Sequence, residues 1–357
     1  MIQLYFIDST GNLILEPTEN EYFRSVISFL EEFRNSDAII VQTSGSTGKP
    51  KKIPLTKSQV IASVSQTKTA FNLTPDDIAI CSLPISYIAG KLMLLRAEVL
   101  GMRAIIIEPS SNPLHNLSSL TKSFFEENSG KLFYAFVPLQ LENILGNQND
   151  IKLLSYAKVV LSGGAALSIS LATKLSNLQL NVYETYGMTE TVTHVAIRKV
   201  SNENIPLPFS FLEGIEHGLN QGNCLKLKGL ITNNQWIQTN DIIEYTSQNA
   251  FRLLGRLDNV INSGAVKLHP EQIEQKISIL FADRNISNAF FCYGKADTQL
   301  GQKLVLFVEG VVSIDLKSLL TNELTKFELP KEIIYVEQLV RTSSNKINRE
   351  KTAQSIL

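Results

Sequence analysis

The sequence predicts an α/β fold, with a large N-terminal domain built on mostly parallel, covered sheets plus a β-rich subdomain, and a small α+β domain after it. Short apolar runs alternate with helical stretches over the first half of the chain, which is the pattern of a parallel sheet covered by helices. From about residue 192 the pattern changes to short strands punctuated by Gly, Asn and Pro. A compact helix-and-strand segment then follows GRLDN at 255–259.

The predicted strands of the large domain are continuous apolar runs, as expected where both faces of a sheet are buried. The first strand, AIIVQ at 38–42, lies between an amphipathic helix at 21–34 and a helix at 56–71 with Thr56 as candidate N-cap. Further strands are predicted at 78–83, 103–108, 132–137 and 157–163, with helices near 90–100, 116–127, 138–146 and 168–176.

The C-terminal part predicts a second, smaller core of its own. Its expected elements are a helix beginning at Pro270, strands at 288–294 and 303–309, and a helix at 315–327. We place the domain boundary at Asp258, which gives an N-terminal domain of residues 1–257 and a C-terminal domain of residues 258–357.

Composition and charge exclude several classes of protein. The 357 residues are 44% hydrophobic and 19% charged, which is typical of a globular protein rather than a disordered chain. The formal net charge of −1 argues against a nucleic-acid partner, since such domains carry a basic excess. No segment approaches the ~20 apolar residues that span a bilayer, and the N-terminus has no signal-peptide pattern. We therefore expect a cytoplasmic protein with no membrane partner, whose Cys81, Cys224 and Cys292 are buried and reduced.

A Gly/Ser/Thr-rich loop with two lysines, TSGSTGKPK at 43–51, directly follows the first predicted strand. Glycine-rich backbone, hydroxyls and lysines together suit a bound polyphosphate. A Walker A loop is excluded, because the glycines are only three apart and proline follows Lys49. The alternative is a flexible linker, which two lysines directly after a buried strand disfavour. The candidate phosphate-binding residues are Thr43, Ser44, Gly45, Ser46, Thr47, Gly48 and Lys51.

This loop and the motifs after it resemble, in the same order, those of the acyl-adenylate-forming superfamily: acyl- and aryl-CoA ligases, luciferases and peptide-synthetase adenylation domains. The resemblance extends from about residue 40 to the end of the chain. SGGAA at 162–166 resembles the family's adenine-side turn, in which Gly163 and Gly164 would let the base lie against the backbone. Taken alone, an ordinary strand–helix turn would be the better interpretation of this segment.

YETYGMTET at 183–191 resembles the Y-G-x-T-E core of the superfamily. The resemblance implies that Tyr186, followed by Gly187, stacks on adenine. It also implies that Thr189 hydrogen-bonds a phosphate and that Glu190 holds Mg²⁺. Magnesium takes one or two carboxylates, with phosphate oxygens and water completing its shell. Without the neighbouring motifs, core packing and a solvated surface charge would be the default readings of Tyr186 and Glu190.

WIQTNDIIEY at 236–245 resembles the family's T-G-D segment, which implies that Asp241 binds the ribose hydroxyls. Asn240 stands where the family has glycine. Because asparagine tolerates left-handed backbone, we expect the turn to survive. The alternative is a common Asn–Asp turn joining two strands.

The segment at 255–274 resembles the family's hinge. The resemblance implies that Arg256 contacts ribose or phosphate and that Asp258 is the pivot of a mobile C-terminal lid domain. RTSSNKINREK at 341–351 resembles the C-terminal motif, with Lys346 as the catalytic lysine and Asn345 in place of a glycine. A basic disordered tail is the alternative.

The family chemistry implies ATP, Mg²⁺ and coenzyme A, together with a small carboxylic acid. Two anions must meet when a carboxylate attacks a phosphate, so positive charge is needed where the bond forms. Lys346 would supply it between the carboxylate and the α-phosphate. Rotation about Asp258 would then remove the lysine before coenzyme A attacks, as a hinge at a domain junction allows.

LPISYIAGKLMLLRAEVLG at 83–101 resembles the substrate-side motif of o-succinylbenzoate–CoA ligases in menaquinone biosynthesis, through Gly90 and Arg96. The substrate is a dicarboxylic acid, and a pocket arginine would pair the carboxylate that does not react. Ser86-Tyr87 replaces the family's aromatic–histidine pair, and a helix-surface arginine is the alternative for Arg96. A phosphate loop that begins as early as residue 43 also fits a ligase for a small acid.

Two other readings stay open from the sequence. One is a ligase for another aryl or short acyl acid. The other is a non-catalytic adenylate-binding sensor on the same scaffold, which the glycine-to-asparagine departures at Asn240 and Asn345 motivate. Self-association into a homo-oligomer is compatible with either reading.

Overall fold

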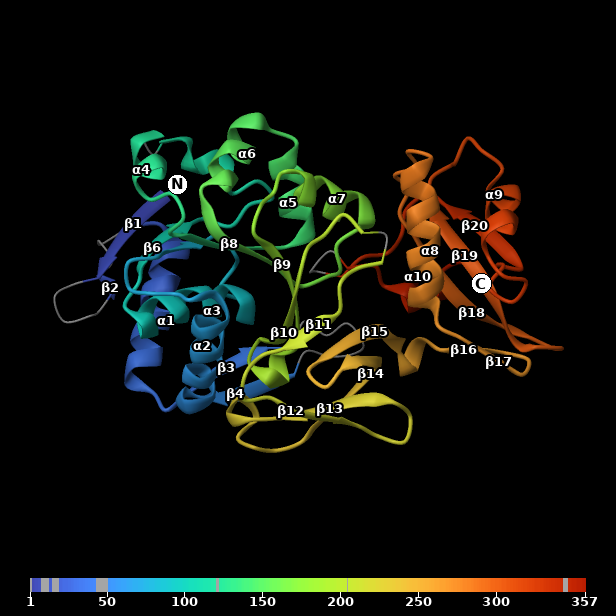
Figure 1. Cartoon of the computed structure of the whole chain (residues 1–357), viewed down its shortest axis with the longest axis horizontal. Coiled ribbons are helices and arrows are strands. Elements are labelled where there is room, and N and C mark those ends of the chain that lie inside the picture. Colours follow the sequence, from blue (N-terminus) through green and yellow to red (C-terminus); the bar gives the residue numbers. More distant parts are fainter. Residues whose placement is uncertain are drawn as a thin grey trace. The chain divides into compact units, whose positions relative to one another are not determined.

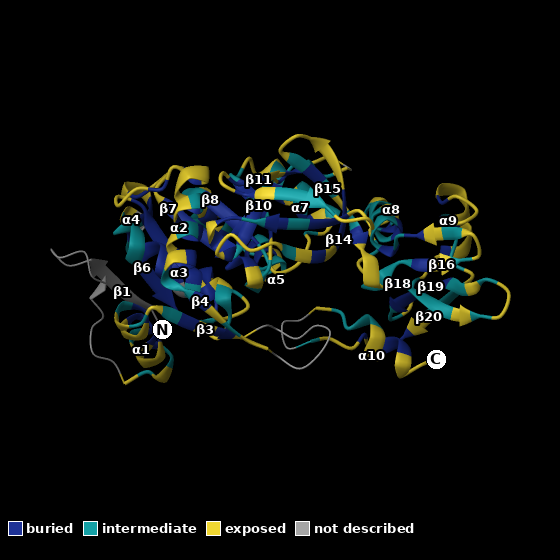
Figure 2. Cartoon of the chain, turned by 90° about the horizontal axis from the view of Figure 1, so that it is seen from below, coloured by how far each residue is buried: buried dark blue, intermediate teal, exposed yellow. Residues whose placement is uncertain are grey.

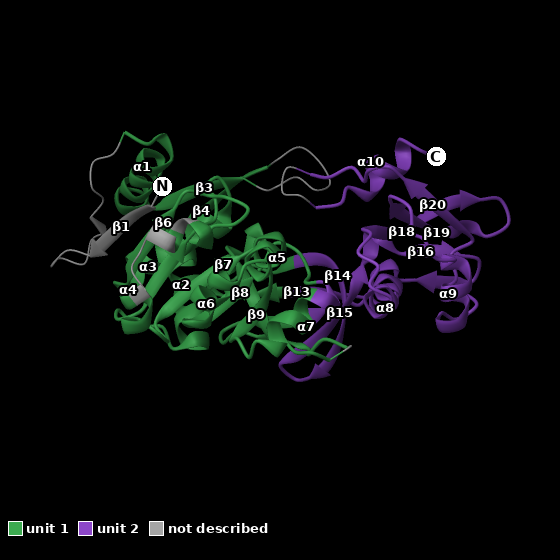
Figure 3. Cartoon of the chain, turned by 90° about the horizontal axis from the view of Figure 1, so that it is seen from above, with its two compact units in different colours: residues 1–167, 171–217, 227–237 green, residues 168–170, 218–226, 238–357 purple. Residues whose placement is uncertain are grey.

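The computed structural model describes residues 2–7, 13–14, 19–42, 51–119, 122–203, 205–342 and 346–357 of the chain (Figure 1). Backbone contacts divide the chain into two compact units (Figure 3). Unit 1 comprises residues 1–167, 171–217 and 227–237, and unit 2 comprises 168–170, 218–226 and 238–357. Both units mix helices and strands, which confirms the predicted α/β class, whereas the boundary at Asp258 and the mobility of the last domain stay predictions.

Unit 1 is built on a mixed sheet whose centre is parallel, as predicted. The strand order is β11-β10-β9-β8-β7-β5-β6-β1-β2. Strands β5 to β9 pair in parallel, while β1 on one side and β10 on the other pair antiparallel. The strands are β1 (Ile2–Ile7), β2 (Leu13–Ile14), β5 (Ile78–Cys81), β6 (Arg103–Ile107), β7 (Leu132–Phe136), β8 (Ala157–Ser162), β9 (Val182–Gly187), β10 (His194–Lys199) and β11 (Phe209–Phe211).

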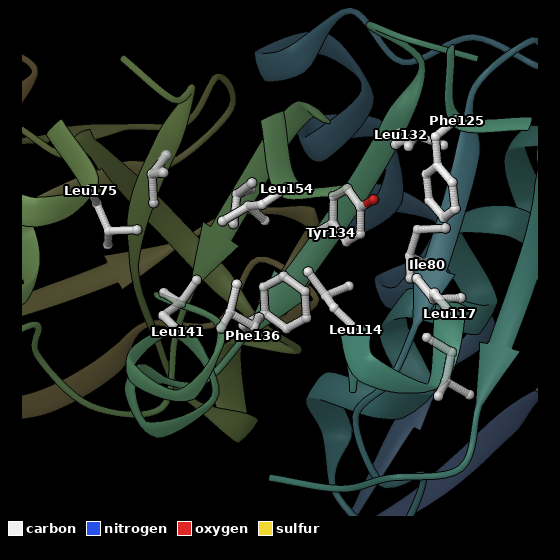
Figure 4. Packing of buried hydrophobic residues seen from close by; sticks show 14 of the residues in the cluster. Ile80, Leu114, Leu117, Phe125, Leu132, Tyr134, Phe136, Leu141, Leu154 and Leu175 are labelled. Atoms are coloured by element: carbon white, nitrogen blue, oxygen red, sulfur yellow. The ribbon is translucent and has the colours of Figure 1, made fainter. Parts of the chain in front are cut away.

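One face of this sheet carries a large apolar core. Figure 4 shows Tyr134 and Phe136 of β7 packed with Leu114, Leu141 and Leu154 from the covering helices. Fully burying side chains of this size stabilises the fold by roughly 1.5–3 kcal/mol each. The covering helices are η1 (Leu114–Ser119), α4 (Lys122–Glu127), α5 (Pro138–Leu145), α6 (Gln148–Ser155) and α7 (Ile169–Asn177).

The opposite face is covered by α2 (Lys57–Phe71) and α3 (Ile88–Leu100). Phe71 of α2 lies against Phe133 of β7, with ring centroids 6.3 Å apart. The predicted N-cap is confirmed, because the Thr56 hydroxyl accepts the Gln59 N–H and the Gln59 side chain accepts the Thr56 N–H. With both faces covered, strands such as β6 and β8 are buried along their length (Figure 2), which explains their continuous apolar runs.

The strand predicted at 38–42 forms as β3 (Ala38–Gln42), but it pairs antiparallel with β4 (Lys52–Thr56) in a separate two-stranded sheet. The strand β4 was not predicted from the sequence. Pro54 lies in its middle, and proline disfavours strands except at sheet edges. The helix α1 (Glu21–Asn35) confirms the prediction at 21–34.

Unit 2 contains the hairpin of β14 (Ile237–Ser247) and β15 (Ala250–Arg256), which continues the predicted β-rich region. The division between the units passes through β12 (Glu216–Leu219), β13 (Cys224–Lys228) and the start of β14. A second sheet has the order β17-β16-β19-β18, with β20 parallel to β19. Its strands are β16 (Ile261–Ser263), β17 (Val266–Leu268), β18 (Phe290–Asp297), β19 (Gly301–Glu309) and β20 (Glu332–Val336).

Both faces of this second sheet are covered. On one face, α8 (Pro270–Asp283) and α9 (Leu316–Glu323) enclose an apolar cluster with β18 and β19. On the other face, Phe291 and Phe307 stack and pack with Ile347 and with Ala353 of α10 (Arg349–Gln354). Residues 347–354, which directly follow Lys346, therefore contribute to a folded core rather than to a disordered tail. No helix in the described part of the chain is long and apolar enough to cross a membrane.

Candidate active site

The predicted phosphate loop connects the two strands of the β3–β4 hairpin. Thr43, Ser44, Gly45, Ser46, Thr47 and Gly48 lie outside the described residues, whereas Lys51 is described and exposed. Gln42 pairs with Lys52 across the hairpin. The two ends of the 43–51 segment are therefore held at adjacent positions, as a loop that wraps a small anion requires.

The glycine turn at Gly163 and Gly164 lies at the carboxyl end of β8. Open α/β sheets bind ligands at this edge. The Gly163 N–H donates to the Phe136 carbonyl at 3.1 Å, and a Cβ at Gly163 would lie 2.8 Å from Thr185 Oγ1. Gly164 has φ +85°, a conformation that side chains disfavour. Glycine is thus favoured at Gly163 by the close approach of the Thr185 side chain and at Gly164 by the positive φ of the backbone.

Tyr186 is buried on β9, next to this turn. Its ring lies 5.9 Å from that of Phe209, and the Arg198 guanidinium lies 4.4 Å from the Phe209 ring centroid. Glu184 forms an ion pair with Arg198 at 2.6 Å and accepts the Leu167 N–H at 2.9 Å. The Glu184 carboxylate therefore ties the strand of Tyr186 to the end of the glycine turn.

A tight backbone turn follows Tyr186. A Cβ at Gly187 would lie 2.1 Å from the Thr193 carbonyl oxygen, so only glycine fits. Val192 is buried with φ +63° and ψ −57°, and the Thr193 N–H donates to the Thr191 carbonyl at 2.7 Å. This is the rarer, strained form of the γ-turn, and strain in a β-branched residue is most often kept at functional sites.

Thr189 and Glu190 lie on the short 3₁₀ helix η2 (Thr189–Thr191), within this turn. Glu190 is exposed, and no group of three metal-ligating side chains occurs in the described ranges. A single accessible carboxylate fits a Mg²⁺ ion that is bound together with nucleotide phosphates and water. It does not fit a metal held by protein ligands alone.

Arg96 of α3 is buried rather than on the helix surface, with only 2% of its surface exposed. Its Nε donates to Thr67 Oγ1 at 3.3 Å, and Nη1 lies 3.6 Å from the Met93 sulfur. Nη2 is buried and has no hydrogen-bond partner among the described residues. Burial lowers the pKa of Arg96 to about 10, so the guanidinium stays charged at neutral pH.

The neighbours of Arg96 are neutral. Burial, aided by the charge of Arg96, lowers the pKa of His194 well below its usual value, and burial raises the pKa of the Cys81 thiol to about 12. The Thr67 hydroxyl donates to the Ser63 carbonyl and accepts from Arg96. Its 3.2 Å contact with His194 Nε2 is then a hydrogen bond only if Nε2 carries the proton.

Sequence reasoning singled out Arg96 but missed Thr67 and His194. Thr67 lies on α2 and His194 begins β10, so the two meet only after the sheet has formed. Gly90 has a steric role here, because a Cβ would lie 2.2 Å from the Pro84 carbonyl oxygen. The glycine lets the chain before α3 fold closely against the first turn of that helix.

In unit 2, Asp241 and Arg256 pair across the β14–β15 hairpin, and Arg256 Nη1 lies 3.4 Å from Asp241 Oδ1. The Arg256 guanidinium also donates to both oxygens of Asp258, at 2.9 and 2.8 Å. Burial opposes ionisation of Asp258, but the hydrogen bonds and charge of Arg256 outweigh it and lower its pKa. The three residues predicted to contact ribose or to form the hinge are thus linked to one another.

Asn240 lies inside β14 and does not have positive φ. The expectation of a left-handed turn at this position, and the alternative of an Asn–Asp turn between strands, are therefore both wrong. Asn240 instead donates a hydrogen bond to the carboxylate of Asp258, which also lowers the pKa of that residue. Asn345 lies outside the described residues.

Lys346 begins the last described stretch and is exposed to solvent. Its carbonyl accepts the Thr342 N–H at 2.8 Å, and its own N–H donates to Thr342 Oγ1 at 3.2 Å. Nearby protein atoms partly remove the Lys346 ammonium from water. This desolvation, and to a lesser degree the positive charge of Arg256, lower the pKa of Lys346. Of the predicted residues that the structure describes, Gly90, Arg96, Gly163, Gly164, Tyr186 and Glu190 lie in unit 1, and Asp241, Arg256, Asp258 and Lys346 lie in unit 2.

Comparison with known proteins identifies the family. The family model described as AMP-binding enzyme matches residues 17–210 of the chain. The chain is 26% identical to 2-succinylbenzoate–CoA ligase of Lactococcus lactis, over 88% of this chain and 70% of that protein. It is 24% identical to oxalate–CoA ligase of Arabidopsis thaliana, over 98% of this chain and 74% of that one.

A solved structure resembles the whole chain. It is an acyl-CoA synthetase (AMP-forming)/AMP-acid ligase II-like protein of Dyadobacter fermentans, with a TM-score of 0.65 and 36% identity over 100% of both chains. The family match covers more than half of the sequence and includes the glycine turn and the Tyr186–Glu190 core. The chain therefore belongs to the AMP-binding enzyme family, as an AMP-forming acid–CoA ligase.

Proposed function

We propose that this ligase activates o-succinylbenzoate with ATP and transfers the acyl group to coenzyme A in the cytoplasm, as a step of menaquinone biosynthesis. The observation that carries the choice of acid is the buried, unpaired positive charge of Arg96. A charge taken out of water is strongly unfavourable unless an opposite charge and hydrogen bonds compensate it. Among the residues that the structure describes, Nη2 of Arg96 has no acceptor, and the neighbouring Cys81 and His194 are uncharged.

A substrate with a second carboxylate supplies the missing charge. A carboxylate that accepts from a guanidinium forms a charge-assisted hydrogen bond, about twice as strong as a neutral one. A monocarboxylic acid uses its only carboxylate in the reaction and leaves Arg96 unpaired. This favours o-succinylbenzoate, and dicarboxylic acids in general, over benzoate or acetate.

In the first step, a substrate carboxylate oxygen attacks the α-phosphorus of ATP and pyrophosphate leaves, which gives the acyl-adenylate. Lys346 would lie between the two anions and offset their repulsion, the kind of electrostatic stabilisation that often dominates catalysis. Tyr186 and the turn at Gly163 and Gly164 would hold adenine, and Asp241 would hold the ribose. Glu190 would hold Mg²⁺, which would offset the negative charge of the polyphosphate.

In the second step, the thiol of coenzyme A attacks the acyl carbon and AMP leaves. The lysine has no role in this step. We propose that residues 258–357 rotate about Asp258 between the steps. The Arg256–Asp258 pair is exposed, and exposed ion pairs are worth only about 0–1 kcal/mol, so this link would not block rotation.

An acid panel tests the substrate choice. The purified chain receives ATP, Mg²⁺ and coenzyme A with o-succinylbenzoate, oxalate, benzoate or acetate, and mass spectrometry identifies the thioester. We expect the highest kcat/KM with o-succinylbenzoate. A preference for oxalate would support a dicarboxylic substrate but contradict the choice of o-succinylbenzoate. A preference for benzoate or acetate would contradict both the choice of acid and the need for a second carboxylate.

A further inference from the structure

We propose that the ion pair between Glu274 and Arg349 positions Lys346 for adenylation, an inference that rests on the proposed function. Glu274 lies on α8, and Arg349 begins α10, three residues after Lys346. Neither residue touches the reacting atoms in this account. They are positioning residues, which join the segment carrying the lysine to the core of the C-terminal sheet.

The geometry of the pair fixes the guanidinium in one orientation. Arg349 Nη1 donates to Glu274 Oε1 at 2.6 Å, and Nη2 donates to Oε2 at 2.7 Å. Both partners also bind the backbone of β18, because the Cys292 N–H donates to Glu274 at 2.7 Å and the Cys292 carbonyl accepts from Arg349 at 3.2 Å. Such a two-pronged pair defines direction as well as distance.

The environment of the pair argues against a role in stability alone. Both side chains are largely buried, with 17% of Glu274 and 26% of Arg349 exposed. Burial of Glu274 raises its pKa, while the charge and hydrogen bonds of Arg349 oppose the shift. The cost of removing two charges from water offsets most of their attraction, so buried pairs contribute little net stability. An apolar pair could match the stability of the Glu274–Arg349 pair, but it would not reproduce the fixed orientation that the two hydrogen bonds impose.

A short hydrogen-bonded ladder transmits this geometry to Lys346. The Asn348 N–H donates to the Val340 carbonyl at 2.8 Å, Ile347 pairs with Arg341, and the Thr342 N–H donates to Lys346. Because these bonds link the backbone on both sides of the lysine, a displacement of Arg349 displaces Lys346 as well. A misplacement of about 1 Å in a reacting group costs on the order of 100-fold in rate.

The test separates positioning from folding. Arg349→Met and Glu274→Gln each break the pair, and Glu274→Gln/Arg349→Met removes both charges while keeping an acceptor for the Cys292 N–H. Glu328→Gln is the matched control, because Glu328 forms a 2.6 Å ion pair with Lys276 of the same helix α8. For each full-length variant, urea unfolding, the adenylation rate and thiolysis of supplied acyl-adenylate are measured.

We expect adenylation kcat to fall by about 10- to 100-fold in all three pair variants, with KM for the acid and thiolysis within about twofold of wild type. The double variant should regain stability but not adenylation, and Glu328→Gln should adenylate normally.

Two results would overturn the proposal: equal losses in adenylation and thiolysis, or recovery of adenylation in the double variant. Failure of the proposed function is a different result, since wild-type protein would then release no AMP with any acid.

Discussion

Arg96 combines burial with an unpaired charge, so replacing it should separate substrate recognition from stability. We expect Arg96→Met to raise KM for o-succinylbenzoate by about 10- to 100-fold, because a hydrogen bond to a charged group is worth about 1.5–3 kcal/mol. Turnover of benzoate should change by less than about twofold. Stability in urea should stay the same or rise, since an uncompensated buried charge is removed.

Arg103→Met provides the control for Arg96, because this arginine also lies in unit 1, is half-buried, and hydrogen-bonds Asn128. It should leave KM for both acids unchanged. Equal losses on o-succinylbenzoate and benzoate in Arg96→Met would mean that Arg96 supports the fold of the pocket rather than binding the second carboxylate.

The lowered pKa of Lys346 should appear in the pH dependence of adenylation. The lysine acts as a cation, so the rate should fall as pH rises through its pKa, and this alkaline limb should lie below the usual lysine range. Arg256→Gln removes a positive neighbour, which raises the pKa of Lys346 and moves the limb to higher pH. Single-turnover adenylation rates, measured across pH at saturating ATP and acid, locate this alkaline limb. The exposed Arg284→Gln is the control. An unmoved limb in Arg256→Gln would exclude Lys346 as its source.

At the residue scale, motif spacing and packing give different information. The spacing within YETYGMTET and RTSSNKINREK sufficed to propose roles for Tyr186 and Lys346 from the sequence alone. Their roles stay predictions. Thr67 and His194 could not be predicted as partners of Arg96, because their meeting depends on helices and a strand that are far apart in the chain. The burial of Arg96 likewise depends on how α3 packs.

The element most sensitive to a single atom is the start of α3. An added methyl at Gly90 would collide with the Pro84 and Leu83 carbonyl oxygens, at 2.2 and 2.5 Å. We expect Gly90→Ala to destabilise the protein by about 1–3 kcal/mol, as overpacked sites do, and to raise KM for o-succinylbenzoate because α3 carries Arg96. Urea unfolding and KM measure the two effects.

Gly146→Ala is the matched control for this substitution, since it lies outside the start of α3 and the nearest atom to its Cβ would be the Asn143 carbonyl oxygen, at 3.2 Å. Gly146→Ala should lower the free energy of unfolding by only a few tenths of the loss expected for Gly90→Ala. If Gly90→Ala is as stable as wild type, the close packing before α3 does not constrain the helix.

Most elements could be predicted because their signals are local. The capping box at Thr56 and the buried runs of β5 to β8 depend on residues close in sequence. The strand β4 could not be predicted, because proline in the middle of a segment, here Pro54, disfavours a strand. Pairing with β3 is what stabilises β4, and this pairing is not visible in the local sequence. The helix α6 was not predicted either, because it has only eight residues, although Gly146 and the N-cap Asn147 separate it from α5.

At the scale of the whole molecule, the order of the motifs gave the family, and the alternation of strands and helices gave the fold class. The boundary at Asp258 is harder to predict, because the β14–β15 hairpin and the C-terminal sheet group within the same compact unit. Asp241 and Arg256 come from the hairpin and Lys346 from the C-terminal segment. The proposed activity therefore requires both regions.

The central claim is that a carboxylate attacks the α-phosphorus of ATP with help from Lys346. The most direct measurement is nucleotide analysis of a reaction containing ATP, Mg²⁺, coenzyme A and o-succinylbenzoate. We expect AMP and pyrophosphate in amounts equal to the thioester, and no AMP from the Lys346→Ala variant. Formation of ADP, or no AMP from wild-type protein with any acid of the panel, would contradict the account.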